Sequence, residues 1–156
     1  MTNRVVFTLA TVMMVLFFLV SNFDRYFFTV HFLESLIYLV MLLLLFYGLE
    51  EWAYVMGVVA PLVWTALTLL SGTSVAGLRA LGRAVSFQGV SSPVELLGGV
   101  LLVVGVALMV ASARAFRREV WGMKGALRVV VLASLIVAAY YAALVYALLH
   151  QASPGS

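Results

Sequence analysis

The sequence predicts an all-α polytopic integral membrane protein, a bundle of about five transmembrane helices. Of its 156 residues, 65% are hydrophobic and only 10% are charged, whereas soluble domains contain roughly 45–50% apolar and about 25% charged residues. A soluble domain of this length could not bury so much apolar surface, because small domains bury a smaller fraction of their surface than large ones. We therefore expect residues 1–156 to form a single transmembrane helical domain.

Five apolar stretches reach or approach the length of about 20 residues that a helix needs to cross the hydrocarbon layer. The expected spans are residues 5–21, 26–49, 51–71, 93–113 and 126–150. The first span follows Arg4 and resembles a signal peptide, but its apolar run is longer than a usual signal core and lacks a convincing small-residue cleavage site. We therefore expect it to be retained as the first helix.

The ends of the later spans carry recognisable helix signals. Gly48 indicates a tight turn, and Glu50 and Glu51 begin the third span at the end where the helix dipole favours acidic side chains. Ser92 and Glu95 flank Pro93 as a capping box, which predicts that the fourth helix begins there.

Small residues recur along the last two spans, as is typical of close helix packing in lipid. In the fourth span they recur every seven residues, at Gly98, Gly105 and Ser112. The fifth span has two such rows, Ser134, Ala138 and Ala142, and Ala139, Ala143 and Ala147. Two rows on one helix predict two neighbours, and the second neighbour is expected to be another copy of the chain or a partner membrane subunit.

The long connection 72–91 contains the pattern of a short amphipathic helix over residues 74–86. Val75, Leu78, Leu81 and Val85 share one face, while Arg79 and Arg83 form a separate row four residues apart. This pattern predicts a helix lying at the membrane interface with its arginines directed to lipid phosphates. A flexible loop is the alternative.

The distribution of basic residues predicts the orientation. With five spans, the N-terminus, the turn between the second and third spans and the loop between the fourth and fifth spans share one side of the membrane. The basic residues on that side are Arg4, Arg114, Arg117, Arg118, Lys124 and Arg128. The other side carries Arg25, Arg79 and Arg83. The positive-inside rule therefore predicts a cytoplasmic N-terminus and a C-terminus outside. Orientation explains the net charge of +3 without nucleic acid, and we expect the cluster from Arg114 to Arg128 to contact anionic lipid headgroups.

The second span carries the strongest candidate for a functional site. His31, Glu34, Ser35 and Tyr38 fall at positions i, i+3, i+4 and i+7, and so form one polar stripe on one helix face. Glu34 lies roughly 12 Å from the start of the span. Contact between lipid and an ionisable group at that depth is costly, so the stripe is expected to face other helices or a wet cavity. The alternative is a structural stripe, in which a protonated Glu34 is hydrogen-bonded to its neighbours.

Other polar residues are expected at the same end of the bundle. Asp24, Arg25, Glu95 and His150 are predicted to lie near the outer mouth of the stripe. Two histidines and a carboxylate have the chemistry to bind a divalent metal, and His31 with His150 has the chemistry to bind a haem. Neither pattern is specific, so we assign no metal and leave the cofactor open. Pro61 predicts a kink in the third span, because proline removes one backbone hydrogen bond.

Three functions remain open. The chain contains no nucleotide-binding, hydrolase or metalloprotease motif and no cysteine, which excludes disulfides and thiolate metal sites. We therefore assign no catalytic residue. The first expectation is a non-catalytic subunit or self-associating bundle of a membrane complex. The second is a small transporter or ligand-binding membrane protein that uses the polar stripe. The third is an intramembrane enzyme, or a redox subunit associated with quinone or haem.

Overall fold

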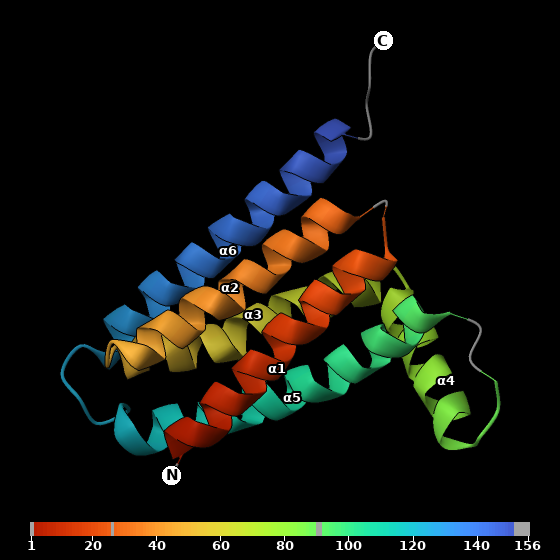
Figure 1. The fold of residues 1–156 in the computed structure, drawn as a ribbon. Coiled ribbons are helices and arrows are strands. Elements are labelled where there is room, and N and C mark those ends of the chain that lie inside the picture. Colours follow the sequence, from red (N-terminus) through yellow and green to blue (C-terminus); the bar gives the residue numbers. More distant parts are fainter. Residues whose placement is uncertain (1, 26, 90–91, 152–156) are drawn as a thin grey trace.

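The computed structural model describes residues 2–25, 27–89 and 92–151, which form six helices and no strand. The helices are α1 (Thr2–Phe23), α2 (Phe28–Phe46), α3 (Glu50–Leu70), α4 (Thr73–Val85), α5 (Pro93–Glu119) and α6 (Ala126–Gln151). The described chain is therefore an all-α bundle, as the sequence predicts (Figure 1).

Five of these helices are long and apolar enough to cross a membrane, namely all except α4. The protein is accordingly an integral membrane protein. The fourth span differs most from its prediction, because α5 ends at Glu119 and not near residue 113. Its last two turns are rich in Ala and Arg, which have high helix propensity, and long basic side chains can reach the headgroup region from a helix end.

The short connections follow from the local sequence. Gly48 has a φ of +77° in the turn between α2 and α3, a left-handed conformation that a glycine adopts without strain. The side chain of Ser92 accepts a hydrogen bond from the backbone N–H of Glu95, so the predicted N-cap of α5 is confirmed.

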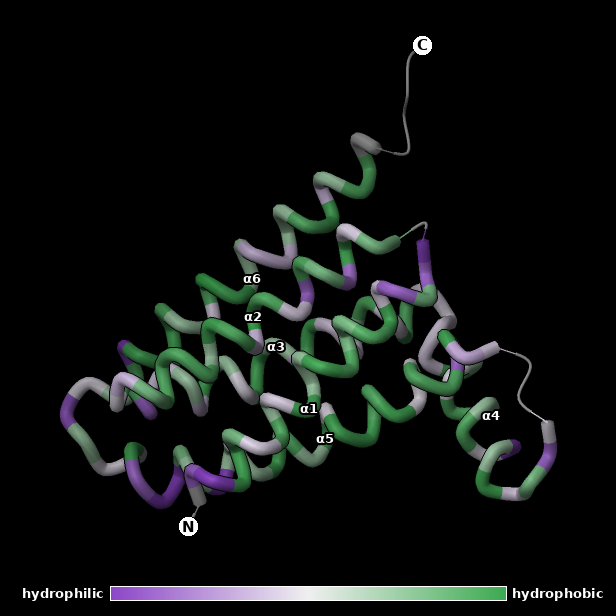
Figure 2. The backbone as a smooth tube through the Cα atoms, in the orientation of Figure 1, coloured by the Kyte–Doolittle hydropathy of each residue, from purple (hydrophilic) through white to green (hydrophobic). Residues whose placement is uncertain are grey.

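Helices α1, α2, α3 and α5 form the centre of the bundle, while α6 packs mainly on α3 and touches α2. The buried positions of α1 are Val6, Ala10, Met13, Phe17 and Val20, a row with alternating spacings of four and three residues. Such a row places all five side chains on the face that meets α2 and α5. Figure 2 shows the hydrophobic colouring along the middle of the helices and the hydrophilic residues concentrated toward the two ends of the bundle.

The predicted helix over residues 74–86 is present as α4, which lies at one end of the bundle against α5 and α3 (Figure 1). Its packing face differs from the apolar face that the sequence suggests. Gly77 is buried and meets the backbone of Gly99 on α5. Of the predicted apolar face, Leu81 also lies against Gly99, whereas Val75, Leu78 and Val85 are exposed. Small residues let α4 approach α5 closely, which leaves most of its larger apolar side chains on the outside of the protein.

The small-residue rows had mixed outcomes. Gly105 and Ser112 of α5 are buried, and Ser112 lies against Gly57 of α3. The two rows on α6 do not pack within the chain, since all their alanines are exposed. The face of α6 that packs is Ala133, Val137, Tyr141 and Leu144.

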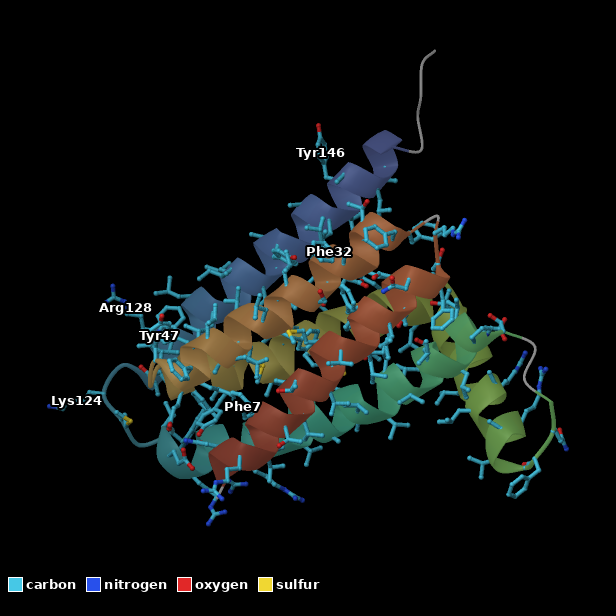
Figure 3. The ribbon with its side chains drawn as sticks, in the orientation of Figure 1. Phe7, Phe32, Tyr47, Lys124, Arg128 and Tyr146 are labelled. Atoms are coloured by element: carbon cyan, nitrogen blue, oxygen red, sulfur yellow. The ribbon has the colours of Figure 1, made fainter. Side chains whose placement is uncertain are left out.

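The two ends of the bundle have different charge. The start of α1, the α2–α3 turn and the α5–α6 loop lie together at one end, which we call the basic end because it carries Arg4, Arg114, Arg117, Arg118, Lys124 and Arg128 (Figure 1). Lys124 and Arg128 extend away from the helices there (Figure 3). The α1–α2 connection and α4 lie at the opposite end. This arrangement is the one that five spans require, and the cytoplasmic location of the basic end stays a prediction.

Candidate functional site

A cavity of about 320 Å³ opens between α1, α2, α3, α4 and α5 at the end opposite the basic end. Its polar lining consists of Asp24, His31, Glu34, Thr68, Thr73, Ser74 and Glu95. Its aromatic lining consists of Phe17, Phe27 and Trp64. We call this space the acidic cavity, because its walls hold three carboxyl groups and no Lys or Arg.

His31 stands between two of these carboxyl groups. Its Nδ1 lies 2.9 Å from Oε2 of Glu34, and its Nε2 lies 3.6 Å from Oδ2 of Asp24. The first distance is a hydrogen bond, while the second is an ion-pair distance only. A neutral imidazole can donate to one carboxylate only, but a doubly protonated ring can donate to both. The imidazole of His31 therefore lies between the carboxyl groups of Glu34 and Asp24 and, when doubly protonated, can interact with both.

The local fold explains this arrangement. His31 and Glu34 are one helical turn apart near the start of α2, so both point to the same side. Asp24 is in the short α1–α2 connection, where its backbone N–H donates to Val20 and its carboxylate accepts from the backbone N–H of Phe27. These bonds fold the connection back over the start of α2, which brings Asp24 to the far side of the imidazole.

The polar stripe on α2 divides into two parts. Glu34 is 7% exposed and faces the acidic cavity together with His31. Ser35 donates to the backbone carbonyl of Phe32 in its own helix, and Tyr38 stacks on Phe17 with ring centroids 5.5 Å apart. Both are buried but neither lines the cavity. Ser35 and Tyr38 therefore belong to the helix packing beneath the site.

The other residues expected near the mouth have different outcomes. Asp24 and Glu95 line the cavity, whereas Arg25 is exposed and does not. The side chain of His150 is outside the described part of the structure. Pro61 is buried in the middle of α3, which continues through it without a break. A Cβ at Gly105 would lie 3.5 Å from Pro61, so this proline packs against α5 one turn below the cavity.

The sequence did not single out the hydroxyl groups that form the wall contributed by α3 and α4. Ser74 donates to Oγ1 of Thr68 at 2.6 Å, and Thr68 donates to the backbone carbonyl of Trp64 at 3.0 Å. The signal was a run of Ser and Thr where the third span ends, at residues 71, 73 and 74. Such a run is also typical of an ordinary loop, so it does not distinguish a site.

A second polar cluster lies at the basic end and was also missed. Tyr54 is fully buried, and its hydroxyl group contacts Asn3 and donates to Oε2 of Glu119 at 2.7 Å. The side-chain amide of Asn3 in turn donates to Glu50, which lies 3.5 Å from the same hydroxyl. These bonds connect α1, α3 and α5, and we call the four residues the Tyr54 cluster.

A closely packed core lies between the acidic cavity and the Tyr54 cluster. Trp64 meets Phe17 edge to face at 5.4 Å, and Met13, Met41 and Tyr38 beside them are almost completely buried. The side chains of Tyr38 and Tyr141 are also buried in this core. Packed side chains therefore lie between the acidic cavity and the basic end.

Within the described residues, no group of three or more His, Cys, Asp or Glu side chains has the spacing to hold a metal ion. Asp24 and Glu34 contact opposite nitrogens of one imidazole, which keeps their oxygens apart. The arrangement is instead suited to attracting positive charge into a partly apolar space. Comparison with protein-family models, curated proteins and solved structures finds no match to the chain.

Proposed function

We propose that the protein is a small transporter or ligand-binding membrane protein whose ligand is a small organic cation bound in the acidic cavity. The single observation that carries this proposal is the convergence of Asp24, Glu34 and Glu95 on one cavity, with His31 as the one basic side chain among its lining residues. Whether the imidazole is neutral or charged, the carboxylates outnumber it, so the cavity favours a cation.

The apolar part of the lining supports an organic cation over an inorganic one. Phe17, Phe27 and Trp64 contribute aromatic surface beside the carboxyl groups, and aromatic faces attract ammonium groups by cation–π interaction. A volume of about 320 Å³ is at the lower end of the range for small-molecule sites. An amine that carries one ring or a few alkyl groups would match both the charge and the size.

Calorimetric titration of the protein in lipid nanodiscs tests this proposal with two probes of the same shape. Benzylammonium carries a positive charge and benzyl alcohol does not. We expect the ammonium to bind at least tenfold more tightly, because a hydrogen bond to a charged group contributes about 1.5–3 kcal/mol. Equal affinity for the two probes, or binding of neither, would contradict the proposal.

Matched variants locate the binding site. Glu34→Gln removes one cavity charge while keeping the shape of the side chain, and we expect it to weaken benzylammonium binding roughly tenfold to hundredfold. Glu51→Gln removes a carboxyl group at the basic end, outside the cavity, and is expected to leave the affinity unchanged. Uptake of the same cation into proteoliposomes then distinguishes a transporter from a binding protein.

A specific feature of α6 favours a second candidate, a self-associating bundle or a subunit of a larger membrane complex. Helix α6 packs on only one side, and its alanine rows, which include Ala138 and Ala142, are exposed. Small-residue rows allow helices to approach closely in lipid. Replacing both alanines with Leu is expected to convert an oligomer into a monomer in mild detergent, and a monomeric wild-type protein would refute this candidate.

A further inference from the structure

A second cavity, of about 520 Å³, lies on the outside of the bundle near the basic end. Helices α5 and α6 are joined by a short loop and then diverge, and their backbones do not approach each other closely along the described chain (Figure 1). Helix α3 contacts both and forms the floor between them. We call this space the α5–α6 groove. Tyr54 and three valines of α3, among them Val58, form its floor, and Ala113, Phe116, Arg117, Trp121 and Val130 form its walls.

The walls of the groove are apolar over most of its length. Val58 on α3, Phe116 on α5 and Val130 on α6 face it from three helices that cross the membrane. Val58 lies eight residues into α3, which places it roughly 12 Å below the helix start. The groove therefore extends from the basic end into the hydrocarbon layer, where an acyl chain is the complementary occupant.

Charge is concentrated at the end of the groove that faces the headgroups. Arg117 is the one charged residue in its lining, with Trp121 beside it. The basic end as a whole has six Lys and Arg residues against three acidic ones, and two of those acids are held in the Tyr54 cluster. A guanidinium group binds phosphate through paired hydrogen bonds, and tryptophan prefers the headgroup level of a bilayer.

We propose that the α5–α6 groove binds one anionic phospholipid, with its phosphate group on Arg117 and an acyl chain along Val58 and Phe116. Basic pockets between transmembrane helices are recognised sites for anionic headgroups. A second copy of the chain fits less well. A packed helix would cover Arg117 without supplying a phosphate, and an unpaired buried charge is costly. The site does not depend on the acidic cavity, which is at the other end.

Native mass spectrometry tests the proposal with purified protein offered equal amounts of phosphatidylglycerol and phosphatidylcholine that carry the same acyl chains. We expect the wild-type protein to retain phosphatidylglycerol in preference, by roughly fivefold or more, since each basic residue near a headgroup contributes about that factor. Arg117→Gln removes the charge and is expected to abolish the preference. Arg118→Gln is the control, because Arg118 is exposed at the same end but does not line the groove.

A second pair of variants tests the acyl-chain part of the groove. Ala113→Trp fills the groove and is expected to reduce retention of both lipids, while Ala107→Trp adds the same side chain at an exposed position of α5 outside it. Helix content by circular dichroism and the elution volume identify variants that fail to fold. The proposal is overturned if Arg117→Gln keeps the wild-type preference, if Ala113→Trp keeps the lipid, or if the wild-type protein is a dimer that Ala113→Trp dissociates.

Discussion

The contact between α4 and α5 gives the sharpest prediction about stability, because two adjacent glycines of α5 have opposite surroundings. A Cβ at Gly99 would overlap the carbonyl oxygen of Gly77 on α4 and lie 2.9 Å from its carbonyl carbon. Both atoms belong to the backbone and cannot rotate away. A Cβ at Gly98 would meet nothing within 4 Å. Gly99→Ala is therefore expected to push α4 off α5, whereas Gly98→Ala is not.

The size of the expected effect on α4 detachment follows from the difference in stability between the two variants. Each gains about 1 kcal/mol of helix propensity when glycine becomes alanine, and this gain cancels in the comparison. Overpacking costs about 1–3 kcal/mol, and only Gly99→Ala incurs it. The population of molecules with α4 detached should thus be roughly fivefold to 150-fold larger in Gly99→Ala than in Gly98→Ala.

Limited trypsin digestion of the purified protein measures this difference. Arg79 and Arg83 are the two basic residues of α4, and cleavage inside a helix requires local unfolding, so its rate follows the population of the open form. We expect rapid cleavage at these arginines in Gly99→Ala and a wild-type rate in Gly98→Ala. Equal cleavage rates in the two variants would refute the close approach of α4 and α5. Because α4 forms one wall of the acidic cavity, Gly99→Ala should also weaken benzylammonium binding.

Three further predictions concern individual contacts. Tyr54→Phe removes the hydroxyl group that two carboxylates share and should destabilise the protein by about 1–3 kcal/mol in thermal unfolding, whereas Tyr47→Phe, at a side chain that is 74% exposed, should have no effect. Ser92→Ala removes the N-cap of α5 and should cost about 1 kcal/mol in the same assay, and an unchanged melting temperature would exclude this cap. Gly57→Ala introduces a Cβ against the side chains of Ser112 and Met41 and should cost about 1–3 kcal/mol. The double variant Gly57→Ala, Ser112→Ala removes the nearest overlapping atom, the Oγ of Ser112, and should recover part of that loss, whereas a double variant as unstable as Gly57→Ala would contradict the close contact between these positions.

Much of the fold was predictable because the signals are local. Apolar runs define the five spans, Gly48 and Ser92 define helix ends, and the pattern around Arg79 predicts α4. The packing faces were less predictable. Lipid is as apolar as a leucine side chain, so burial in the protein does not select the largest apolar face. Helix α4 accordingly packs through Gly77, and α6 packs through the row that contains Val137.

The candidate site was predictable only in part, for the same physical reason. The spacing of His31 and Glu34 along one helix identifies a polar face, and the structure extends that face to Asp24 and Glu95 across the cavity. Ser35 has the same spacing but bonds to its own helix, which a periodic pattern cannot distinguish. In the Tyr54 cluster, Tyr54 is separated along the chain from Asn3 by 51 positions and from Glu119 by 65 positions. A local sequence pattern therefore cannot predict this cluster.

The charge and accessibility of the acidic cavity can be measured directly, because the chain has no cysteine of its own. Thr73→Cys places a single thiol in the cavity wall, where it can react with either a cationic or an anionic methanethiosulfonate reagent. We predict that the cationic reagent modifies this thiol at least about tenfold faster than the anionic one, and that Glu34→Gln reduces the ratio. Equal rates for the two reagents, or a faster anionic reaction, would contradict a cation-binding cavity.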